Sequence, residues 1–306
     1  MVRYVLYRLA MAVPLFLGAA LLIFVAGHLA PGDPVQSLLG DRYTPATAAV
    51  LRHQLGLDRP FAAQFVDYLG QLATFRFGTS YVNPGLRVGD LLRTALPISL
   101  RLATLAVAAA AVVGTVLGVV AATVPGRPLD RLIQFGVVLG LSVPSFVTAA
   151  ALVYLFALHF RLLPVAGWGH PSDYVLPVIV LSIAPLAFIT RIARSSVGQV
   201  LLEDYVRTAR SKGLRTPRVL FRHVLRNAAL PVVTTIGMAF GTAIVGAFVV
   251  EVVFNVPGIA RVAVNAIFQR DYTVLQATVL VYTALFSFVN LAVDVSYAYL
   301  NPRVRY

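Results

Sequence analysis

Long apolar runs separated by short polar segments dominate the chain. Six of these runs have the length of a membrane span, and they cover Leu9–Leu29, Pro97–Thr123, Leu132–Leu158, Tyr174–Ile192, Ala228–Val250 and Thr273–Leu300. An α-helix rises about 1.5 Å per residue, so roughly 20 apolar residues cross the ~30 Å hydrocarbon layer of a bilayer. The pattern therefore predicts an all-α integral membrane protein with six transmembrane helices.

Composition supports a membrane protein and excludes several other classes. Only 12% of the residues are charged, whereas soluble domains carry about 25%. The net charge of +13 lies in the segments between the apolar runs, and no nucleic-acid recognition motif accompanies it. We therefore expect no nucleic-acid partner. Cysteine is absent, which excludes disulfides and thiolate metal sites.

The distribution of charge predicts an orientation. With both termini on the cytoplasmic side, the inner segments carry 15 basic and 3 acidic residues, and the outer segments carry 10 and 8. This bias follows the positive-inside rule, so we expect cytoplasmic termini in a bacterial cytoplasmic membrane. The first apolar run is longer than the core of a signal peptide, and we interpret it as a retained helix.

Residues 30–96 form the longest outer segment of the predicted topology. Gln64, Asp67, Tyr68 and Gln71 recur at helical spacing there, with apolar residues on the other side. This pattern predicts a small folded cap of short helices. A later outer segment, Glu251–Tyr272, mixes apolar and polar residues, and we expect it to dip into the membrane or to cap a cavity.

Motifs for independent chemistry are missing. The sequence lacks a phosphate-binding GxxxxGK[ST] loop, an HExxH motif and a GxSxG elbow. The five histidines are scattered over different segments, which does not favour a metal site. We therefore expect no enzymatic activity, no metal and no cofactor in this chain.

The inner segment Glu203–Pro231 is the longest polar interruption in the C-terminal part of the chain. It carries seven basic residues: Arg207, Arg210, Lys212, Arg215, Arg218, Arg222 and Arg226. Two interpretations stay open here. The arginines can meet anionic lipid headgroups, or a helix at Asp204–Lys212 can dock into a groove on a soluble partner.

Helix signals divide this segment in two. In the first predicted helix, Val206, Ala209 and Gly213 share one face, and Arg207, Arg210 and Leu214 share another. Gly213 is expected to end that helix in the left-handed conformation. A second short helix is expected to begin with Thr216 as N-cap and Pro217 in its first turn, and Arg218, Arg222 and Arg226 form a basic stripe on it.

Polar residues in or beside the last two spans are candidates for a translocation path or gate. They are Glu251, Asn255, Asn290 and Asp294. An acid inside a membrane faces protein or a water-filled cavity. Structural alternatives remain: Asp294 can pair with another span, and Glu251 can lie at the outer interface.

Several sequence motifs together resemble one family. They include LAPGDPV (Leu29–Val35), QLGLDRPF (Gln54–Phe61), FGTSY (Phe77–Tyr81), RPLDR (Arg127–Arg131), LSVPSF (Leu141–Phe146), YVRTARSKGL (Tyr205–Leu214), HVLRNAALPVVT (His223–Thr234), VEVVFNVPGIAR (Val250–Arg261), RDYTVLQ (Arg270–Gln276) and NLAVDVSYAYLNPRVRY (Asn290–Tyr306). In this order the chain resembles permease subunits of the dipeptide, oligopeptide and nickel ABC importers, of the first-permease type.

The resemblance covers nearly the whole chain and implies both a fold and partners. It implies a single transmembrane domain over residues 1–306, with an extracytoplasmic cap at 30–96 and a cytoplasmic coupling loop at 203–227. The implied partners are a second permease, two ATPase subunits that hold ATP and Mg²⁺, an extracytoplasmic substrate-binding protein and membrane lipid. The implied function is to form the translocation path of an ATP-driven importer with the second permease.

The resemblance also assigns a coupling segment. Its residues are Asp204, Arg207, Thr208, Ala209, Arg210, Ser211, Lys212, Gly213 and Leu214. Importers of this type carry Glu-Ala-Ala, three residues and Gly in the coupling helix. Here the glycine is Gly213 and the second alanine is Ala209, but Arg207 stands where the family has glutamate.

Two other functions remain as alternatives. One is a stand-alone, proton-coupled secondary transporter, and the other is a membrane scaffold without transport. Secondary transporters usually show paired broken helices in two halves, and no such symmetry is visible in the sequence. The substrate stays open among peptides, nickel chelates, glutathione and haem-like ligands.

Overall fold

The computed structural model describes residues 2–29, 34–40, 43–74, 76–83 and 85–300, without the side chains of residues 2–9, 34, 37, 294 and 296–300. The chain divides into two compact units. One comprises Leu100–Val256 and the segment from Val289 onward, and the other comprises Val2–Ser99 and Pro257–Phe288.

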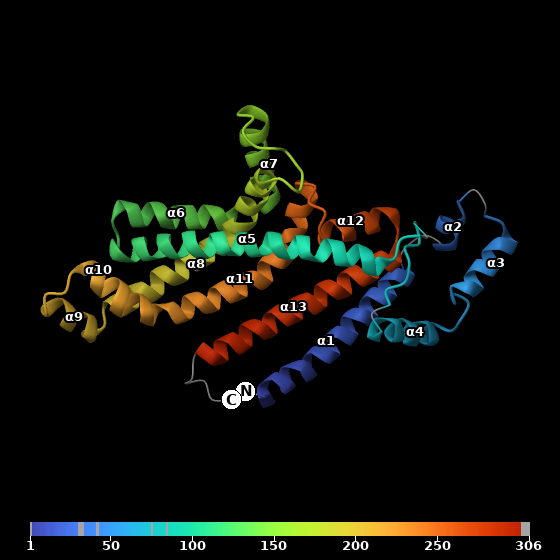
Figure 1. The fold of residues 1–306 in the computed structure, drawn as a ribbon, viewed down its shortest axis with the longest axis horizontal. Helices are drawn as coiled ribbons and strands as arrows, with labels where there is room; N and C mark the ends of the chain where they lie inside the picture. The colour runs from blue at the N-terminus through green and yellow to red at the C-terminus, as the bar shows by residue number, and fades with distance from the viewer. Residues whose placement is uncertain (1, 30–33, 41–42, 75, 84, 301–306) are drawn as a thin grey trace. The chain divides into compact units, whose positions relative to one another are not determined.

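Helices make up nearly all the regular structure of the described residues, apart from an isolated β-bridge between Thr79 and Arg87. The long helices, labelled in Figure 1, are α1 (Val2–Leu29), α5 (Val88–Thr123), α8 (Val175–Leu201), α11 (Leu225–Val253) and α13 (Tyr272–Leu300). In the described part, five helices are long and apolar enough to span a membrane, or six if a bent pair counts as one span. The predicted all-α membrane fold is therefore confirmed.

The third predicted span, Leu132–Leu158, is bent and broken rather than continuous. It is divided into α6 (Pro128–Ser142), α7 (Ser145–Leu152) and a π-helical turn, η2 (Val153–His159), with a bend of 106° at the break. Pro144 cannot donate a backbone hydrogen bond, and it forces the residue before it out of the helical region. Val143 accordingly adopts the extended values φ −88° and ψ 122°. Figure 1 shows α7 turning away from the direction of α6.

Within the first unit, α8 is the central helix. It packs along α11 and beside α6, and it meets α5 at two glycines spaced four residues apart. A Cβ atom at Gly114 would lie 2.9 Å from the Leu186 carbonyl oxygen, and one at Gly118 would lie 2.5 Å from the Ala193 Cβ atom. Small residues at this spacing let two membrane helices approach closely. The close α5–α8 contact therefore depends on having glycine, which lacks a side chain, at positions 114 and 118.

The second unit contains the predicted helical insertion, which is confirmed as α2 (Pro34–Leu39), α3 (Pro45–Gln54) and α4 (Phe61–Ala73). Phe24 of α1 anchors α4, because its ring centroid lies 5.1 to 5.4 Å from those of Phe61, Phe65 and Tyr68. Aromatic pairs at such distances stabilise packing beyond simple area burial. The insertion is thus fixed to the C-terminal part of α1.

Asp271 joins the loop before α5 to the start of α13 in the same unit. Its side chain is 2% exposed and accepts hydrogen bonds from the Ser80 hydroxyl, from the Tyr81 amide at 3.2 Å and from the Val274 amide at 3.3 Å. A buried carboxylate needs such partners.

The same unit contains α12 (Ile259–Gln269), whose first amide, at Ile259, donates to the Ser99 hydroxyl at 2.9 Å.

Candidate functional site

The helix predicted at Asp204–Lys212 is present as α9 (Asp204–Ser211), and its role in coupling stays a prediction. Its apolar face is buried, with Val206 at 0% and Ala209 at 7% exposure. Both side chains join an apolar cluster with residues of α5, α8 and the start of the following helix: Ala122, Val197, Val219, Val224 and Ala228. Packing at this cluster fixes α9 to the ends of three long helices, so a force on α9 can reach them.

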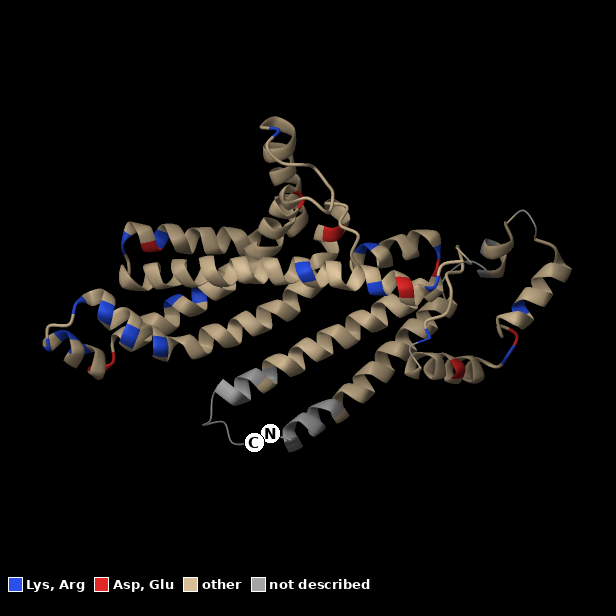
Figure 2. Ribbon diagram, viewed as in Figure 1, with Lys and Arg blue, Asp and Glu red and all other residues tan. Residues whose placement is uncertain are grey.

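The opposite face of α9 is free of protein in the described structure. Arg207, Thr208, Arg210, Ser211 and Lys212 are all exposed. Asp204 is also exposed and lies 3.7 Å from Arg207 in an ion pair one turn apart. Figure 2 shows lysine and arginine gathered on α9 and α10. An anchored helix with one exposed basic face has the arrangement needed to dock with an acidic groove.

Gly213 ends α9 as predicted. It has a left-handed φ of +77°, its amide donates to the Arg210 carbonyl at 2.9 Å, and the Leu214 amide donates to the Ala209 carbonyl at 3.3 Å. These two bonds form a Schellman motif, in which glycine adopts the left-handed conformation without steric cost. The turn directs the chain from α9 into the next helix.

Leu214 does not share the basic face, contrary to the sequence prediction. It is half-buried and packs against the apolar cluster beneath α9. The prediction applied helical spacing to position 214, which lies beyond the expected end at Gly213, and α9 itself ends at Ser211. Residues beyond the Schellman turn follow a different path, so helical spacing no longer applies to them.

The predicted second helix is present, but its N-cap is wrong by one residue and it is not a separate short helix. Arg215 is its N-cap, with φ −63° and ψ 141°, and Thr216 is already helical. α10 (Thr216–Val219) continues through a π-helical turn, η4 (Leu220–Val224), into α11, so Thr216–Val253 is one run of 38 residues. Pro217 fits the first turn because its missing amide has no partner there. The exposed basic stripe of Arg218, Arg222 and Arg226 therefore lies on an extension of a long helix.

An ion pair with a buried carboxylate ties the start of α6 to α8 in the same unit. Asp130 is 3% exposed, and it accepts hydrogen bonds from Arg194 Nε at 2.7 Å and Nη2 at 2.8 Å. The Gly126 amide donates to the same carboxylate at 2.8 Å. Sequence reasoning missed this pair because its members are 64 residues apart and lie on different helices, α6 and α8.

The four path candidates occupy different environments. Glu251 near the end of α11 is completely buried. Asn255 is exposed and left-handed, with φ +57°, and Asn290 is half-buried. The side chain of Asp294 lies outside the described residues. The role of these residues in a path or gate stays a prediction.

A polar cavity of about 370 Å³ lies within the second unit. Its wall includes the four residues predicted to share one face of α4: Gln64, Asp67, Tyr68 and Gln71. Other walls come from α1, with His28, and from α13, with Gln276. The polar stripe on α4 was the only signal of this cavity in the sequence, because the remaining wall residues are distant in the chain.

Hydrogen bonds order one end of this cavity. The Gln64 side-chain amide donates to the Arg59 carbonyl at 2.8 Å, which turns Gln64 Oε1 toward His28 Nε2 at 3.0 Å. His28 Nδ1 lies 2.9 Å from the Phe24 carbonyl oxygen. Both ring nitrogens thus lie within hydrogen-bonding distance of an oxygen atom.

Tyrosine hydroxyls line the same space. Burial raises the pKa of Tyr68 above its usual value, and burial also raises the pKa of Tyr81, despite a hydrogen bond to Thr273. Both phenols therefore stay neutral at physiological pH and keep a proton to donate. Among the described residues, the buried Tyr68 hydroxyl has no hydrogen-bond partner.

Two protein-family models match this chain, one in its C-terminal part and one in its N-terminal part. The model described as the inner membrane component of binding-protein-dependent transport systems matches residues 114–306, and the corresponding N-terminal model matches residues 1–102. The two matches together leave only a short segment of α5 uncovered. They support an importer permease over a stand-alone secondary transporter or a scaffold.

Similar curated proteins match over the full length. A glutathione transport system permease of Salmonella typhimurium is 40% identical over 306 residues, covering 100% of both chains. A probable peptide ABC transporter permease of Sinorhizobium fredii is 38% identical, covering 99% of each chain. A dipeptide transport system permease of Bacillus subtilis is 36% identical, covering 100% of this chain and 98% of its own.

Solved structures agree on the fold. An inward-facing structure of the MetNI methionine ABC transporter aligns with a TM-score of 0.60 at 15% identity, covering 69% of this chain and 96% of that chain. A structure of an amino acid ABC transporter aligns with a TM-score of 0.55 at 17% identity, covering 68% and 93%. The chain belongs to the family of inner membrane permeases of binding-protein-dependent ABC importers.

Proposed function

We propose that the chain forms, with a second homologous permease, the translocation path of an ATP-driven importer for short peptides. Two ATPase subunits bind ATP and Mg²⁺ on the cytoplasmic side, and an extracytoplasmic binding protein delivers the substrate. The chain itself carries no cofactor and catalyses no reaction. Its termini and α9 face the cytoplasm, and α2, α3 and α4 face the outside.

This proposal rests on one observation, that α9 has one buried face and one exposed face. Its inner face is buried among residues of α5, α8 and α11, and its outer face is exposed. ATP binding closes the two ATPase subunits. A groove on one of these subunits holds the exposed face of α9 and moves the helix, and the buried face of α9 transmits this movement to the long helices. Coupling requires that the groove favours one state of the helices over the other.

The departure from the family motif affects the contact with the ATPase. Arg207 replaces the glutamate expected on the exposed face, and it pairs with Asp204 across 3.7 Å. A cationic side chain at this position favours an acidic partner surface. We propose that the groove of the matching ATPase carries a carboxylate opposite Arg207.

The substrate class is proposed from the relatives. Those named for peptides, dipeptides and glutathione share 36–40% identity over nearly the full chain. Glutathione is itself a small peptide, so these names agree on short peptides as a class. We therefore place peptides ahead of nickel chelates and haem-like ligands.

Single-cysteine crosslinking tests the proposed coupling contact. The chain contains no cysteine, so Thr208→Cys on the exposed face of α9 introduces a unique thiol. We expect a benzophenone maleimide at this position to crosslink to an ATPase subunit in native membranes. Val66→Cys on α4 is the matched control, because Val66 is 65% exposed and lies in the proposed outer cap.

The outcome separates the remaining functions. Crosslinking from position 208 and not from position 66 supports the importer. If affinity purification through this chain retains no ATPase and position 208 crosslinks to none, the importer proposal is wrong. Peptide uptake by the purified chain alone, without ATPase, would support a secondary transporter instead.

A further inference from the structure

The cavity beside α4 has no role in the coupling described above, and it is built from residues suited to a ligand. Its volume of about 370 Å³ lies in the lower part of the range of small-molecule pockets, roughly 300–1,000 Å³. All of its lining residues belong to the second unit. The cavity is therefore a property of one compact part of the chain.

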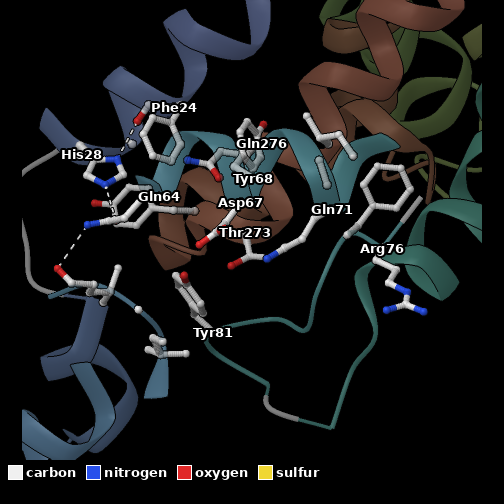
Figure 3. A pocket seen from close by; sticks show the side chains of 18 of the residues that line it. Phe24, His28, Gln64, Asp67, Tyr68, Gln71, Arg76, Tyr81, Thr273 and Gln276 are labelled. Atoms are coloured by element: carbon white, nitrogen blue, oxygen red, sulfur yellow. Dashed lines mark hydrogen bonds between the residues drawn. The ribbon is translucent and has the colours of Figure 1, made fainter. Parts of the chain in front are cut away.

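Charged groups of both signs line the cavity. Asp67 supplies a carboxylate, and Arg52 and Arg76 supply two guanidinium groups. Figure 3 shows Arg76 at one side of the cavity, Asp67 nearer its middle and His28 at the opposite side. Among the described residues, Arg76 has no ion-pair partner. A ligand with a carboxylate at one end and an ammonium group at the other complements this distribution.

Neutral hydrogen-bonding groups occupy the space between the charges. Figure 3 shows the side chains of Gln71 and Tyr81 pointing into the cavity, with Gln276 of α13 behind them. Amide and hydroxyl groups of this kind can donate to and accept from the backbone of a peptide. Leaving a buried hydroxyl such as that of Tyr68 without a partner is unfavourable. A bound ligand offers it a partner.

The spacing of the charges limits the length of the ligand. α4 rises about 1.5 Å per residue, so the backbones of positions 67 and 73 are roughly 9 Å apart, and Arg76 follows three residues later. An extended peptide spans about 3.3–3.6 Å per residue. A chain of about three residues is therefore comparable in length to this part of α4.

We propose that this cavity binds a short peptide of about three residues, with its C-terminal carboxylate on Arg76 and its N-terminal ammonium group on Asp67. The proposal rests on the proposed function as a peptide importer and adds a binding site within this permease. Asp67 already pairs with Arg59, but both side chains are about half exposed. Such exposed pairs are weak, so an ammonium group can share the carboxylate.

Peptide binding to the whole assembly tests the proposal. The chain, its partner permease and the ATPases are reconstituted in phosphatidylglycerol nanodiscs without the external binding protein. This lipid carries no ammonium group, so no zwitterionic headgroup competes for the cavity. Binding of radiolabelled trialanine is measured by equilibrium dialysis, and we expect it to be saturable.

Two substitutions and one altered ligand locate the bound peptide. Arg76→Gln is expected to weaken trialanine binding about tenfold, because it removes a charge-assisted hydrogen bond. Trialanine amide, which lacks the carboxylate, is expected to bind the unaltered assembly about tenfold more weakly than trialanine. The Arg76→Gln assembly is expected to bind both ligands equally. Arg93→Gln, an exposed arginine outside the cavity, is the matched control and is expected to change nothing.

Tyr68→Phe probes the buried hydroxyl without changing the shape of the wall. The hydroxyl has no partner in the described structure, so its removal is not expected to destabilise the chain. If the peptide provides the partner, trialanine binding weakens about fivefold. Thermal unfolding measured on the same sample separates lost binding from lost folding.

Two results overturn the proposal. One is the absence of saturable trialanine binding by a folded assembly, and the other is an Arg76→Gln assembly that still prefers trialanine to its amide. ATPase subunits are quantified in the same nanodiscs. If they are present and no peptide binds, only the cavity proposal fails, whereas their absence contradicts the proposed function.

Discussion

Gly118 on α5 approaches Ala193 on α8 so closely that a Cβ atom at position 118 would lie 2.5 Å from the Ala193 Cβ atom. The same Cβ would lie 2.6 Å from the Thr190 carbonyl oxygen and 2.9 Å from the Arg194 amide nitrogen. Two of these three neighbours are backbone atoms, which cannot rotate away. The contact brings α5 against the part of α8 that also carries Arg194.

Gly118→Ala is expected to destabilise the chain by about 1–3 kcal/mol, because the added methyl overpacks a close helix contact. The thermal unfolding midpoint of the purified chain measures the effect. Gly136→Ala on α6 is the matched control, since a Cβ atom there meets nothing within 4 Å. Equal stability of the two variants would contradict a tight α5–α8 contact.

The ion pair between Asp130 and Arg194 is expected to contribute an interaction energy to the stability of the chain. Asp130→Asn and Arg194→Gln should each lower stability, and Arg194→Gln should do so more, because it leaves the buried Asp130 carboxylate without its counter-charge. The double variant should lose less than the sum of the single changes, with a coupling energy on the order of 1–2 kcal/mol. Unfolding midpoints of the four proteins in one detergent give this energy.

An exposed pair on α5 provides the control for this cycle. Asp90 and Arg93 lie 4.0 Å apart, with side chains 63% and 86% exposed. Their coupling energy is expected to be close to zero, since solvent screens exposed charges. If both cycles gave the same coupling, burial of Asp130 would not be the source of its stabilising effect.

Sequence patterns predicted the features that depend on neighbouring residues. The buried face of α9 at Val206 and Ala209 followed from helical spacing, and the left-handed Gly213 followed from the need to end that helix. The polar face of α4 was visible for the same reason. Such features are local because their cause lies within one or two turns of helix.

Features that depend on distant residues, or on competition between signals, were not predicted. Asp130 meets Arg194 only because α6 and α8 pack together. Pro144 was accepted inside a span, since membrane helices tolerate proline, but here it breaks the third span. Thr216 was predicted as the N-cap because threonine is a preferred N-cap residue. The helix begins one residue earlier than expected, so Arg215 is the N-cap.

The orientation of the chain can be tested with two unique thiols. Thr208→Cys is expected to react with a membrane-impermeant maleimide only in inverted vesicles, and Val66→Cys only in intact spheroplasts, because charge bias places α9 inside and α4 outside. Mass spectrometry of the labelled chain gives the result. The unaltered chain, which contains no cysteine, must remain unlabelled. Labelling in the reverse pattern would contradict cytoplasmic termini.

The turn after α9 is the most direct test of coupling. A Cβ atom at Gly213 meets nothing within 4 Å, so only the φ of +77° opposes a side chain there. Forcing an L-residue into this region costs roughly 1–2 kcal/mol, and a β-branched residue tolerates it least. Gly213→Val is therefore expected to shift or unwind the end of α9 and to abolish transport in reconstituted vesicles, while membrane insertion stays intact.

Gly126 makes it possible to separate coupling from backbone strain. It has a similar φ of +73°, and a Cβ atom there also meets nothing within 4 Å, but it lies in the turn between α5 and α6. Gly126→Val should lower the unfolding midpoint about as much as Gly213→Val, and it should keep transport coupled to ATP hydrolysis. Gly213→Asn should preserve more transport than Gly213→Val, because asparagine adopts the left-handed conformation more readily. Full transport by Gly213→Val would show that the end of α9 does not carry the movement, since the strain would then have no effect on coupling.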